Sequence, residues 1–241
     1  MIKKEIAMLW RKIFLGSLLV IALAAVWSCD KTDDNPFVDP ESGLSDDKKY
    51  FLEIAMGPQF AQGNNFLTRW TDTIFLFNIN KQYTHLNSEL ARIAGQINDL
   101  KANVHVSIVE NESEATLKAY FGDANTYALL EPDAAGLIGE NSGFSWITWN
   151  NKNEILGGTF FVDVNRTTLE DCQKHVLREK LTQSLGLLFD SQQYPNSIFF
   201  KDWTCTTEYD PLDISVIRYH YNVAFSPGMA RADVVNVLKR L

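Results

Sequence analysis

The chain has 241 residues, of which 46% are hydrophobic and 22% are charged, and its formal net charge is −8 at pH 7. This length and composition suffice for one well-packed domain, or for a domain with a small appendage. An acidic surface repels the phosphate backbone, so nucleic acid is not an expected partner.

The N-terminal residues predict a secretory signal. A basic stretch precedes the apolar run 13–26, which as a helix covers only about 21 Å, less than the roughly 30 Å of a bilayer core. The run ends in Val-Trp-Ser-Cys, which resembles a bacterial lipobox. We therefore expect residues 1–28 to be a lipoprotein signal peptide and Cys29 to carry the lipid. An ordinary secretory signal with an incidental cysteine is the alternative.

Residues 29–45 are expected to be a flexible acidic tether, because they include two prolines and little to bury. The early stretch 31–34, Lys-Thr-Asp-Asp, resembles acidic signals that send lipoproteins to the cell surface, and plain linker composition is the alternative. Without residues 1–28 the chain keeps 18 basic and 29 acidic residues, a net charge of −11. The expected location is the bacterial cell envelope, lipid-anchored in the outer membrane on its periplasmic face or at the cell surface.

Alternating and β-branched residues predict five strands. The first, 73–79, precedes a helix that Thr84 is expected to cap and whose apolar residues recur in steps of three and four up to Leu100. The other four strands are predicted at 103–110, 115–122, 144–150 and 154–165. In the last of these, Gly157 and Gly158 suit a β-bulge.

A second long helix follows the last strand. Thr167-x-x-Glu170 is expected to form a capping box that opens it, and Gly186 to end it after about Leu185. The elements predict an α+β fold in the order β-α-β-β-β-β-α, with a twisted mixed sheet of about five strands and two long helices.

The C-terminal part is expected to be small and helical. Asp210-Pro211 predicts the start of one helix, and a last helix is expected to contain Val234, Leu238 and Leu241. Residues 46–241 are thus predicted to form a single domain, with the sheet and the second long helix in 60–190 and a C-terminal subdomain in 191–241.

Cys172 and Cys205 are expected to pair in an oxidising compartment. Such a bond would stabilise the fold by roughly 3–4 kcal/mol in the chain-entropy model. Two buried thiols are the alternative.

Residues 178–191, REKLTQSLGLLFDS, align with the zinc-peptidase frame HExxHxxGxxH followed by Asp. In that frame two histidines one helical turn apart hold the metal, and the glutamate after the first polarises a water. Here Glu179 and Gln183 take the first and second ligand positions, Lys180 the general-base position and Phe189 the third ligand position. Gln is a poor zinc ligand, Phe is none, and a protonated lysine repels a cation. We therefore expect no catalytic residue, no metal and no cofactor.

This stretch and the order of the elements resemble an uncharacterised bacterial lipoprotein family related to the metzincin, or matrixin-like, zinc peptidases. The resemblance covers roughly residues 60–241, with matches at LTRW (67–70), ATLKAYFG (115–122), LTQSLGLLFDSQQYPNSIFF (181–200) and LDISVIRYHYNVAFSPGM (212–229). As the resemblance implies, the family helix usually reads Arg-Glu-Glu-x-Thr-Gln, so its histidines are already lost. Lys180 here replaces the second glutamate, which removes the residue that could have kept the general base.

The resemblance also assigns structural parts to the C-terminal region. Asp213, Ile217, Tyr219 and Tyr221 look like the closing helix of matrixin-like domains. Residues 227–229, Pro-Gly-Met, could suggest the Met-turn but follow that helix, so its slot is expected near 197–199, which contain no methionine. Met229 is expected to be an ordinary packing residue.

His175 and Glu179, four residues apart, could form a two-ligand metal site. One of three histidines could supply the next ligand of this site: His85, His105 or His220. The alternative is a simple contact along one helix. Glu179 and Gln183 are expected to be a buried polar pair that braces the former cleft through backbone partners.

Four aromatic residues are expected near the edge of the cleft, where they either form a shelf for a sugar or a peptide or fill the core: Trp146, Trp149, Phe160 and Phe161.

The sequence therefore predicts an envelope-anchored lipoprotein whose metzincin-like domain has lost zinc and catalysis. Its expected partner, besides the membrane, is an extended peptide or an envelope protein held beside an edge strand. One alternative is a hydrolase that uses Glu179 with His175, without the usual zinc site. Another is a purely structural envelope protein, and kinship of fold does not choose among these.

Overall fold

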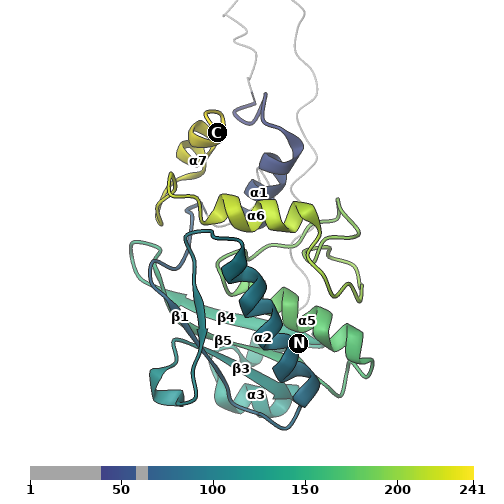
Figure 1. The fold of residues 1–241 in the computed structure, drawn as a ribbon. Coiled ribbons are helices and arrows are strands. Elements are labelled where there is room, and N and C mark those ends of the chain that lie inside the picture. The colour runs from purple at the N-terminus through teal and green to yellow at the C-terminus, as the bar shows by residue number, and fades with distance from the viewer. Residues whose placement is uncertain (1–38, 58–64) are drawn as a thin grey trace, which may run out of the picture. The chain divides into compact units, whose positions relative to one another are not determined.

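A five-stranded mixed β-sheet forms the lower part of the described structure as drawn in Figure 1, with helices on both of its faces. The computed structural model describes residues 39–57 and 65–241, so the predicted signal peptide, Cys29 and most of the predicted tether lie outside the described residues. Asp39–Leu241 form one unit that contains the described core, so this part of the chain can fold alone. No described helix is long and apolar enough to cross a membrane.

Most neighbouring strands run parallel. β1 (Ile74–Asn78) lies between β2 (Val106–Ile108) and β3 (Leu117–Gly122), and β3 pairs with β5 (Ile155–Asp163). β4 (Gly143–Trp149) pairs antiparallel with β5, which gives the order β2-β1-β3-β5-β4 and leaves β4 at one edge. The predicted α+β class, element order and five-stranded mixed sheet are confirmed.

The predicted bulge beside the glycine pair is also confirmed. Thr148 pairs with Gly157 and Trp149 with Ile155, so Leu156 is an additional residue in β5. An additional residue bends and twists a hairpin locally, and here it turns the end of β4 and β5.

Two long helices pack on one face of the sheet. α2 (Thr84–Asp99) and α5 (Glu170–Gln183) contact each other, and α5 also contacts β4 and β5. Their buried side chains share one core with the strands: Leu86, Leu90, Ile93, Ile97, Val176, Leu177, Leu181, Phe160 and Val162. On the opposite face, α3 (Ala124–Leu130) and α4 (Ala135–Ile138) cover a smaller cluster that contains Phe161.

The caps of the long helices differ from the prediction. The N-caps are Tyr83 and Leu169, and neither makes a side-chain cap. Thr167 Oγ1 is buried without a hydrogen-bond partner among the described residues, so the predicted capping box with Glu170 is wrong. The turn after β5 is instead organised by the side chain of Asp163, which accepts from the backbone of residues 165 and 166.

The C-terminal end of α5 is as predicted. Gly186 follows the helix with φ of 104°, and a Cβ there would lie 2.1 Å from the backbone oxygen of Thr68. Both the backbone conformation and the close approach require glycine, so the chain can turn directly after α5.

The packed domain begins earlier than predicted. α1 (Asp46–Met56), which the sequence pattern did not single out, is buried along much of its length. Glu41 and Leu44, both inside the predicted tether 29–45, are buried as well, and Arg231 Nε donates to Glu41 Oε1 at 2.7 Å. The last residues of that segment therefore belong to the domain.

α6 (Pro211–His220) packs on α1, and α7 (Arg231–Leu238) follows near the C-terminus (Figure 1). Asp210 makes a capping box with Asp213, so the predicted start of α6 is confirmed. α7 ends at Leu238, and Leu241, which was expected in that helix, is exposed.

Asp213 joins two segments of the C-terminal region and reaches α1 through Ser197. Its carboxylate accepts from Ser197 Oγ and from the backbone N–H of Ile198 and Asp210, and Tyr50 of α1 contacts Ser197 Oγ through its hydroxyl. Burial raises the pKa of Asp213 to about 6. The slot expected for a Met-turn is thus held by hydrogen bonds to a buried carboxylate.

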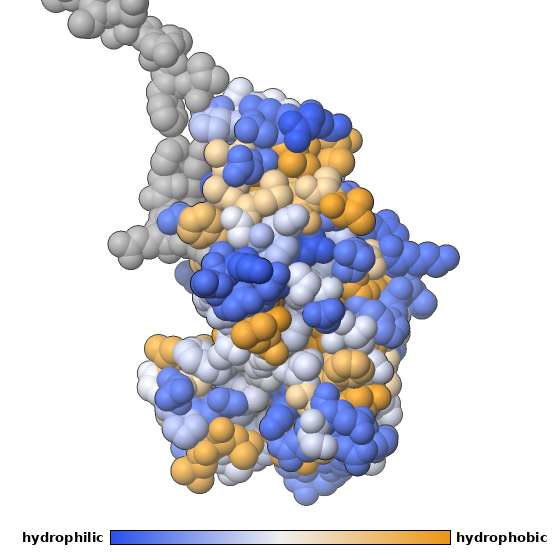
Figure 2. Space-filling view, turned by 90° about the vertical axis from the view of Figure 1, so that its left-hand side faces the viewer, coloured by the Kyte–Doolittle hydropathy of each residue, from blue (hydrophilic) through white to orange (hydrophobic). Residues whose placement is uncertain are grey.

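Exposed hydrophobic side chains come from several elements, among them Phe75, Ile108, Leu129, Leu137, Leu156, Leu169, Trp203 and Val223. On the face in Figure 2, hydrophobic residues lie in small groups among hydrophilic ones. Scattered apolar residues are ordinary on protein surfaces, so this face by itself does not mark an interface.

A buried ion pair fastens α5 to α2. Arg178 is fully buried, and its guanidinium donates to Glu89 Oε1 at 3.0 Å and to Gln96 Oε1 at 2.7 Å. The same group lies over the ring of Tyr209, 4.4 Å from its centre. Because a buried charge is tolerated only when it is paired, α5 is held in one position against α2.

Arg178→Ala should destabilise the domain by about 3–5 kcal/mol, since it leaves the buried Glu89 carboxylate with less compensation. Urea unfolding of the chain from residue 39 measures the loss. Lys118→Ala is the control, because Lys118 forms a half-exposed pair with Glu112 and should cost less than about 1 kcal/mol. Equal losses in the two variants would contradict the assignment.

His220 is fully buried behind the end of α5. Its Nε2 lies 3.2 Å from the backbone oxygen of Leu185. Burial, followed by the charge of Arg69, lowers the pKa of His220 to about 3. The folded chain therefore keeps this imidazole neutral where the unfolded chain would protonate it.

The stability that His220 contributes should be present above pH 6.5 and lost as the pH falls from 6.5 toward 3, by about 1.4 kcal/mol per pH unit. Urea midpoints between pH 7.5 and pH 5 should fall less steeply in His220→Gln than in the unsubstituted chain. Asp213, whose pKa is raised, acts in the opposite direction in both proteins, so the difference in slope isolates His220. Parallel slopes would show that the ring is protonated when folded.

Candidate functional site

The aligned motif lies on the side of α5 turned away from the core. Leu177, Leu181 and Leu185 are fully buried and form its packed side. Glu179 and Lys180 are half-buried. α5 crosses close to the start of β4, where a Cβ on Gly143 would lie 2.4 Å from Val176 Cγ1. The polar stripe is therefore placed beside the edge strand.

Four polar side chains form a chain of contacts along this stripe. Lys180 Nζ donates to Glu179 Oε1 at 2.6 Å and to Gln183 Oε1 at 3.2 Å. Gln183 Nε2 donates to Asp190 Oδ1 at 2.8 Å. We call Glu179, Lys180, Gln183 and Asp190 the polar relay. Glu179 and Gln183 are indeed partners, but side chains rather than the expected backbone groups hold them.

The polar relay changes what these positions can do. The ammonium of Lys180 lies between the groups in the first and second ligand positions, where it competes with any cation for their oxygens. Phe189, in the third position, is half-buried and offers no donor atom. Among the residues that the structure describes, no three His, Cys, Asp or Glu side chains are grouped so as to hold a metal ion.

Asp190 is the member of the relay that sequence reasoning passed over. It is exposed as a residue, yet protein packed around its carboxyl group, and then the charge of Glu179, raise its pKa. Its place directly after the motif frame was the available signal.

His175 lies one turn before Glu179 and is bound to a loop. Its Nδ1 lies 2.8 Å from the backbone oxygen of Thr206, and its Nε2 lies 3.3 Å from Thr204 Oγ1. His175 Nε2 and Glu179 Oε2 are 3.9 Å apart, too far for a hydrogen bond. Burial lowers the pKa of His175, which favours the neutral ring. The geometry therefore gives no support to His175 and Glu179 as an acid–base pair.

None of the other histidines completes a site with His175. His85 Nε2 contacts Gln173 Oε1 at 2.6 Å, and His220 is buried at the end of α5. His105 is exposed. The hypothesis that one of these residues supplies a further ligand is wrong for the described structure.

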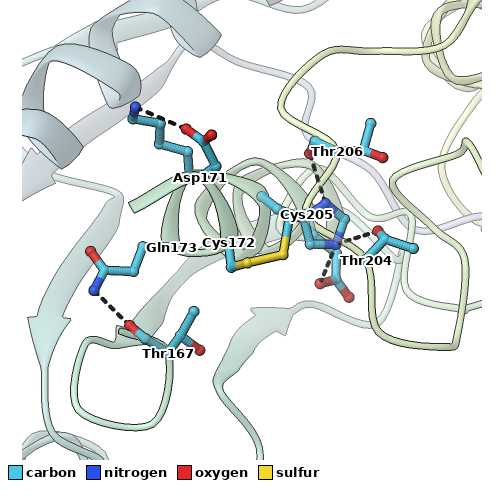
Figure 3. The surroundings of a disulfide bond; sticks show 10 residues. Thr167, Asp171, Cys172, Gln173, Thr204, Cys205 and Thr206 are labelled. Atoms are coloured by element: carbon cyan, nitrogen blue, oxygen red, sulfur yellow. Dashed lines mark hydrogen bonds and ion pairs between the residues drawn. A yellow bond between two sulfur atoms is a disulfide. The ribbon is translucent and has the colours of Figure 1, made fainter. Parts of the chain in front are cut away.

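A disulfide joins Cys172 of α5 to Cys205, as expected, with the two Cα atoms 4.3 Å apart (Figure 3). Cys205 lies between Thr204 and Thr206, which contact His175. Arg92, which belongs to α2, donates to the backbone oxygen of residue 207 in this loop. The loop 201–209 is thus fastened to both long helices.

Replacing both cysteines with serine should lower the free energy of unfolding by about 3–4 kcal/mol, because the unfolded chain loses the constraint of a closed loop. The loop separates the cysteines by 33 positions. Urea unfolding with and without a phosphine reductant measures the effect. The reductant should lower the midpoint of the unsubstituted chain and leave that of the serine variant unchanged. An unsubstituted chain that does not respond to the reductant would contradict the bond.

The four aromatic residues expected near the cleft divide into two kinds. Phe160 and Phe161 are fully buried on opposite faces of the sheet and fill the two cores. Trp149 is 45% exposed, and Trp146 is half-buried and stacks on Phe144. A continuous shelf of all four is therefore wrong, and Phe144 with Trp146 remains as an aromatic pair on β4.

An open hollow of about 610 Å³ lies elsewhere, between the β4–β5 turn and the segment before α7. Its lining residues are Phe66, Thr71, Asn151, Lys152, Asn153, Glu154, Ser226, Pro227 and Gly228. None of the predicted site residues lines it, so the hollow and the polar relay are separate features.

The fold and the site define an α+β domain with a five-stranded mixed sheet and a zinc-peptidase-like helix whose ligand positions hold Glu, Gln and Phe. Residues 46–240 match the family described as "Protein of unknown function (DUF2927)", and the chain belongs to this family.

Solved structures with some likeness to this fold include two of myroilysin. "Crystal structure of myroilysin" is 11% identical with a TM-score of 0.42, covering 64% of this chain and 86% of that chain. "Structure of Myroilysin" is 13% identical with a TM-score of 0.34, covering 54% of this chain and 48% of that chain. Neither likeness supports an argument about activity. No curated protein matches the chain in sequence.

Proposed function

We propose that this domain binds an extended peptide along β4 without cleaving it. The main support for this proposal is the position of β4, which is an antiparallel strand at the edge of the sheet and lies beside the polar relay. An edge strand presents backbone groups that an added strand can pair with.

The register tells which backbone groups are available. Asp163 N–H donates to Ser142 O, so alternate residues of β4 pair with β5. Gly143, Ser145 and Ile147 lie in the other set and direct their N–H and C=O groups outward. No described residue makes a hydrogen bond with these outward groups. Three successive outward residues suffice to pair with a short peptide strand.

The side chains of β4 favour a peptide with alternating character. On one face of the strand, Phe144 and Trp146 form the aromatic pair. At its start, Gly143 lies close to α5, where a Cβ would be 3.1 Å from Lys180 Cγ. An added strand would therefore direct alternate side chains toward aromatic rings and toward the polar relay.

The polar relay supports binding rather than hydrolysis. Lys180 is ion-paired with Glu179, and a lysine ammonium cannot accept a proton from water near neutral pH. The chemistry of a zinc peptidase needs histidine ligands and a glutamate base, and the aligned positions hold neither.

The setting of this activity also belongs to the proposal. The lipobox-like sequence ending at Cys29 supports attachment to a membrane of the bacterial envelope, with residues 30–38 as the remaining tether. The domain would then present β4 to peptides or unfolded segments near that membrane.

Peptide binding can be tested with a substitution on the outer side of β4. A labelled peptide is first selected from an array with the chain from residue 39, and its affinity is measured by fluorescence anisotropy. Ser145→Pro removes an outward N–H and should weaken binding roughly tenfold, the cost of about one unpaired backbone group. Ser145→Ala, which keeps the N–H, should bind as the unsubstituted chain does.

If Ser145→Pro and Ser145→Ala bind the peptide equally well, the peptide does not bind along β4. Failure to select any peptide would overturn the proposed function. Mass spectrometry of the peptide after incubation should show no cleavage, and cleavage products lost on Glu179→Ala would favour the hydrolase instead.

A further inference from the structure

We propose that the open hollow beside the β4–β5 turn binds a neutral saccharide. The volume of this hollow is about 610 Å³, which lies within the range of small-ligand pockets. Its lining includes neither the polar relay nor the outward residues of β4, so this site is independent of the proposed peptide binding.

Backbone hydrogen bonds join the three segments that form the walls of the hollow. In the segment before β1, Leu67 O accepts from the N–H of Gly228 at 2.8 Å, which ties it to the segment before α7. The N–H of Arg69 donates to Asn153 O at 3.2 Å, which ties the same segment to the β4–β5 turn. The walls are therefore held together without a ligand.

A buried arginine fixes these walls from the core side. Arg69 Nη1 donates to the backbone oxygens of Asn222 and Phe225 at 3.2 and 3.1 Å, and its guanidinium lies over the ring of Tyr221, 4.7 Å from its centre. The chain that leads to Ser226 is thus held against the segment before β1. A preformed hollow needs little ordering when a ligand binds, which favours affinity.

The β4–β5 turn is fixed by the side chain of Asn150. Its Oδ1 accepts from the backbone N–H of Lys152 and Glu154, and its Nδ2 donates to Glu154 Oε2 at 2.7 Å. Opposite the turn, Gly228 has φ of 81°, and a Cβ there would lie 3.0 Å from Lys152 O. The turn and the segment before α7 therefore approach so closely that glycine is required.

The lining is rich in groups that both donate and accept hydrogen bonds. Two side chains are amides and two are hydroxyls: Asn151, Asn153, Thr71 and Ser226. Among the described residues, the side chains of Asn151, Asn153 and Ser226 have no hydrogen-bond partner. Each hydroxyl of a sugar is likewise both a donor and an acceptor, so amides and hydroxyls can pair with it in either direction.

The charge of the lining favours a neutral ligand. Lys152 is the one cation and Glu154 the one anion among the lining residues, so their formal charges cancel. Specific recognition of a phosphate or carboxylate generally uses arginine or several cations, and a divalent cation needs several oxygen ligands. The hollow supplies neither set, whereas one ammonium and one carboxylate can both bind neutral hydroxyl groups.

An aromatic side chain supplies the apolar part of the site. Phe66 is 46% exposed and lines the hollow together with Pro227. A pyranose ring has C–H groups on its faces, and these can pack on an aromatic surface while the hydroxyls at its edge reach polar partners. Because the hollow is open, it can accept one unit of a longer chain.

The test uses the isotope-labelled chain from residue 39 with three neutral probes: cellohexaose, maltohexaose and the tetramer of N-acetylglucosamine. Backbone amide signals are followed by NMR as each probe is added to roughly 10 mM, which detects binding with a Kd near 1 mM. At least one probe should shift the amides of 66–71, 151–154 and 226–228, and should leave those of β4 in place.

Phe66→Ala and Asn151→Ala should each weaken binding of that probe about tenfold, because each removes one contact of the sugar ring. Phe75→Ala is the matched control. Phe75 is a phenylalanine of similar exposure, 39%, that lies on β1 outside the hollow, so this variant should bind within about twofold of the unsubstituted chain. Circular dichroism checks that each variant is folded.

Two further measurements test the class of ligand. Raising sodium chloride from about 20 to about 300 mM should change the affinity less than twofold, because salt does not screen contacts of an uncharged ligand. Hexagalacturonate, an anionic sugar of similar size, should bind no more tightly than the neutral probes.

The absence of shifts with all three neutral probes would overturn the proposal. Shifts that persist in both Phe66→Ala and Asn151→Ala would also overturn it, because the sugar would then lie elsewhere. Binding of hexagalacturonate alone, weakened by salt, would show that the ligand class is wrong. Shifts of the lining amides by the selected peptide, and by no sugar, would assign the hollow to the peptide instead.

Discussion

The buried guanidinium of Arg178 is the constraint on which the placement of α5 depends. It has no access to water, so it must be compensated inside the protein. The compensation comes from α2 through Glu89 and Gln96, and from the loop 201–209 through the ring of Tyr209. Because these partners come from separate parts of the chain, one charge holds two helices and a loop in register.

The position of α5 determines which side chains form the candidate site. Once α5 is held over β4 and β5, its outward stripe can only lie beside the edge strand. The stripe holds Lys180 among the oxygens of Glu179 and Gln183. The ligand positions of a zinc peptidase would need to attract a cation, but here they surround the positive charge of Lys180. The outward backbone groups of β4 are then the part of the site that can still bind a partner.

The loop 201–209 adds a second level of organisation. Cys205 and Thr206 fasten it to α5, and Glu208 accepts a pair of hydrogen bonds from Arg92 of α2. The same contacts orient His175 toward Glu179. A histidine that looks isolated in the helical sequence is therefore held at both ring nitrogens by this loop.

Much of the fold was predictable from local pattern. The five strands, the two long helices and the bulge beside Gly157 follow from periodicity and from glycine, which act within a few residues of the chain. The pairing of Cys172 with Cys205 was expected from their number and compartment. The starts of α2 and α5 were not predictable, because a threonine that can cap a helix does so only if tertiary contacts leave it at the N-cap.

The sequence by itself determined the class of fold, the loss of the histidine ligands and the disulfide partners, because each depends on residue identity or on short-range periodicity. Only the tertiary structure decided which strand forms the edge, that Asp190 joins Gln183, and that the loop around Cys205 contacts His175. Contacts between residues far apart in the chain depend on how helices and strands pack. No local pattern encodes the partner of a buried charge such as Arg178.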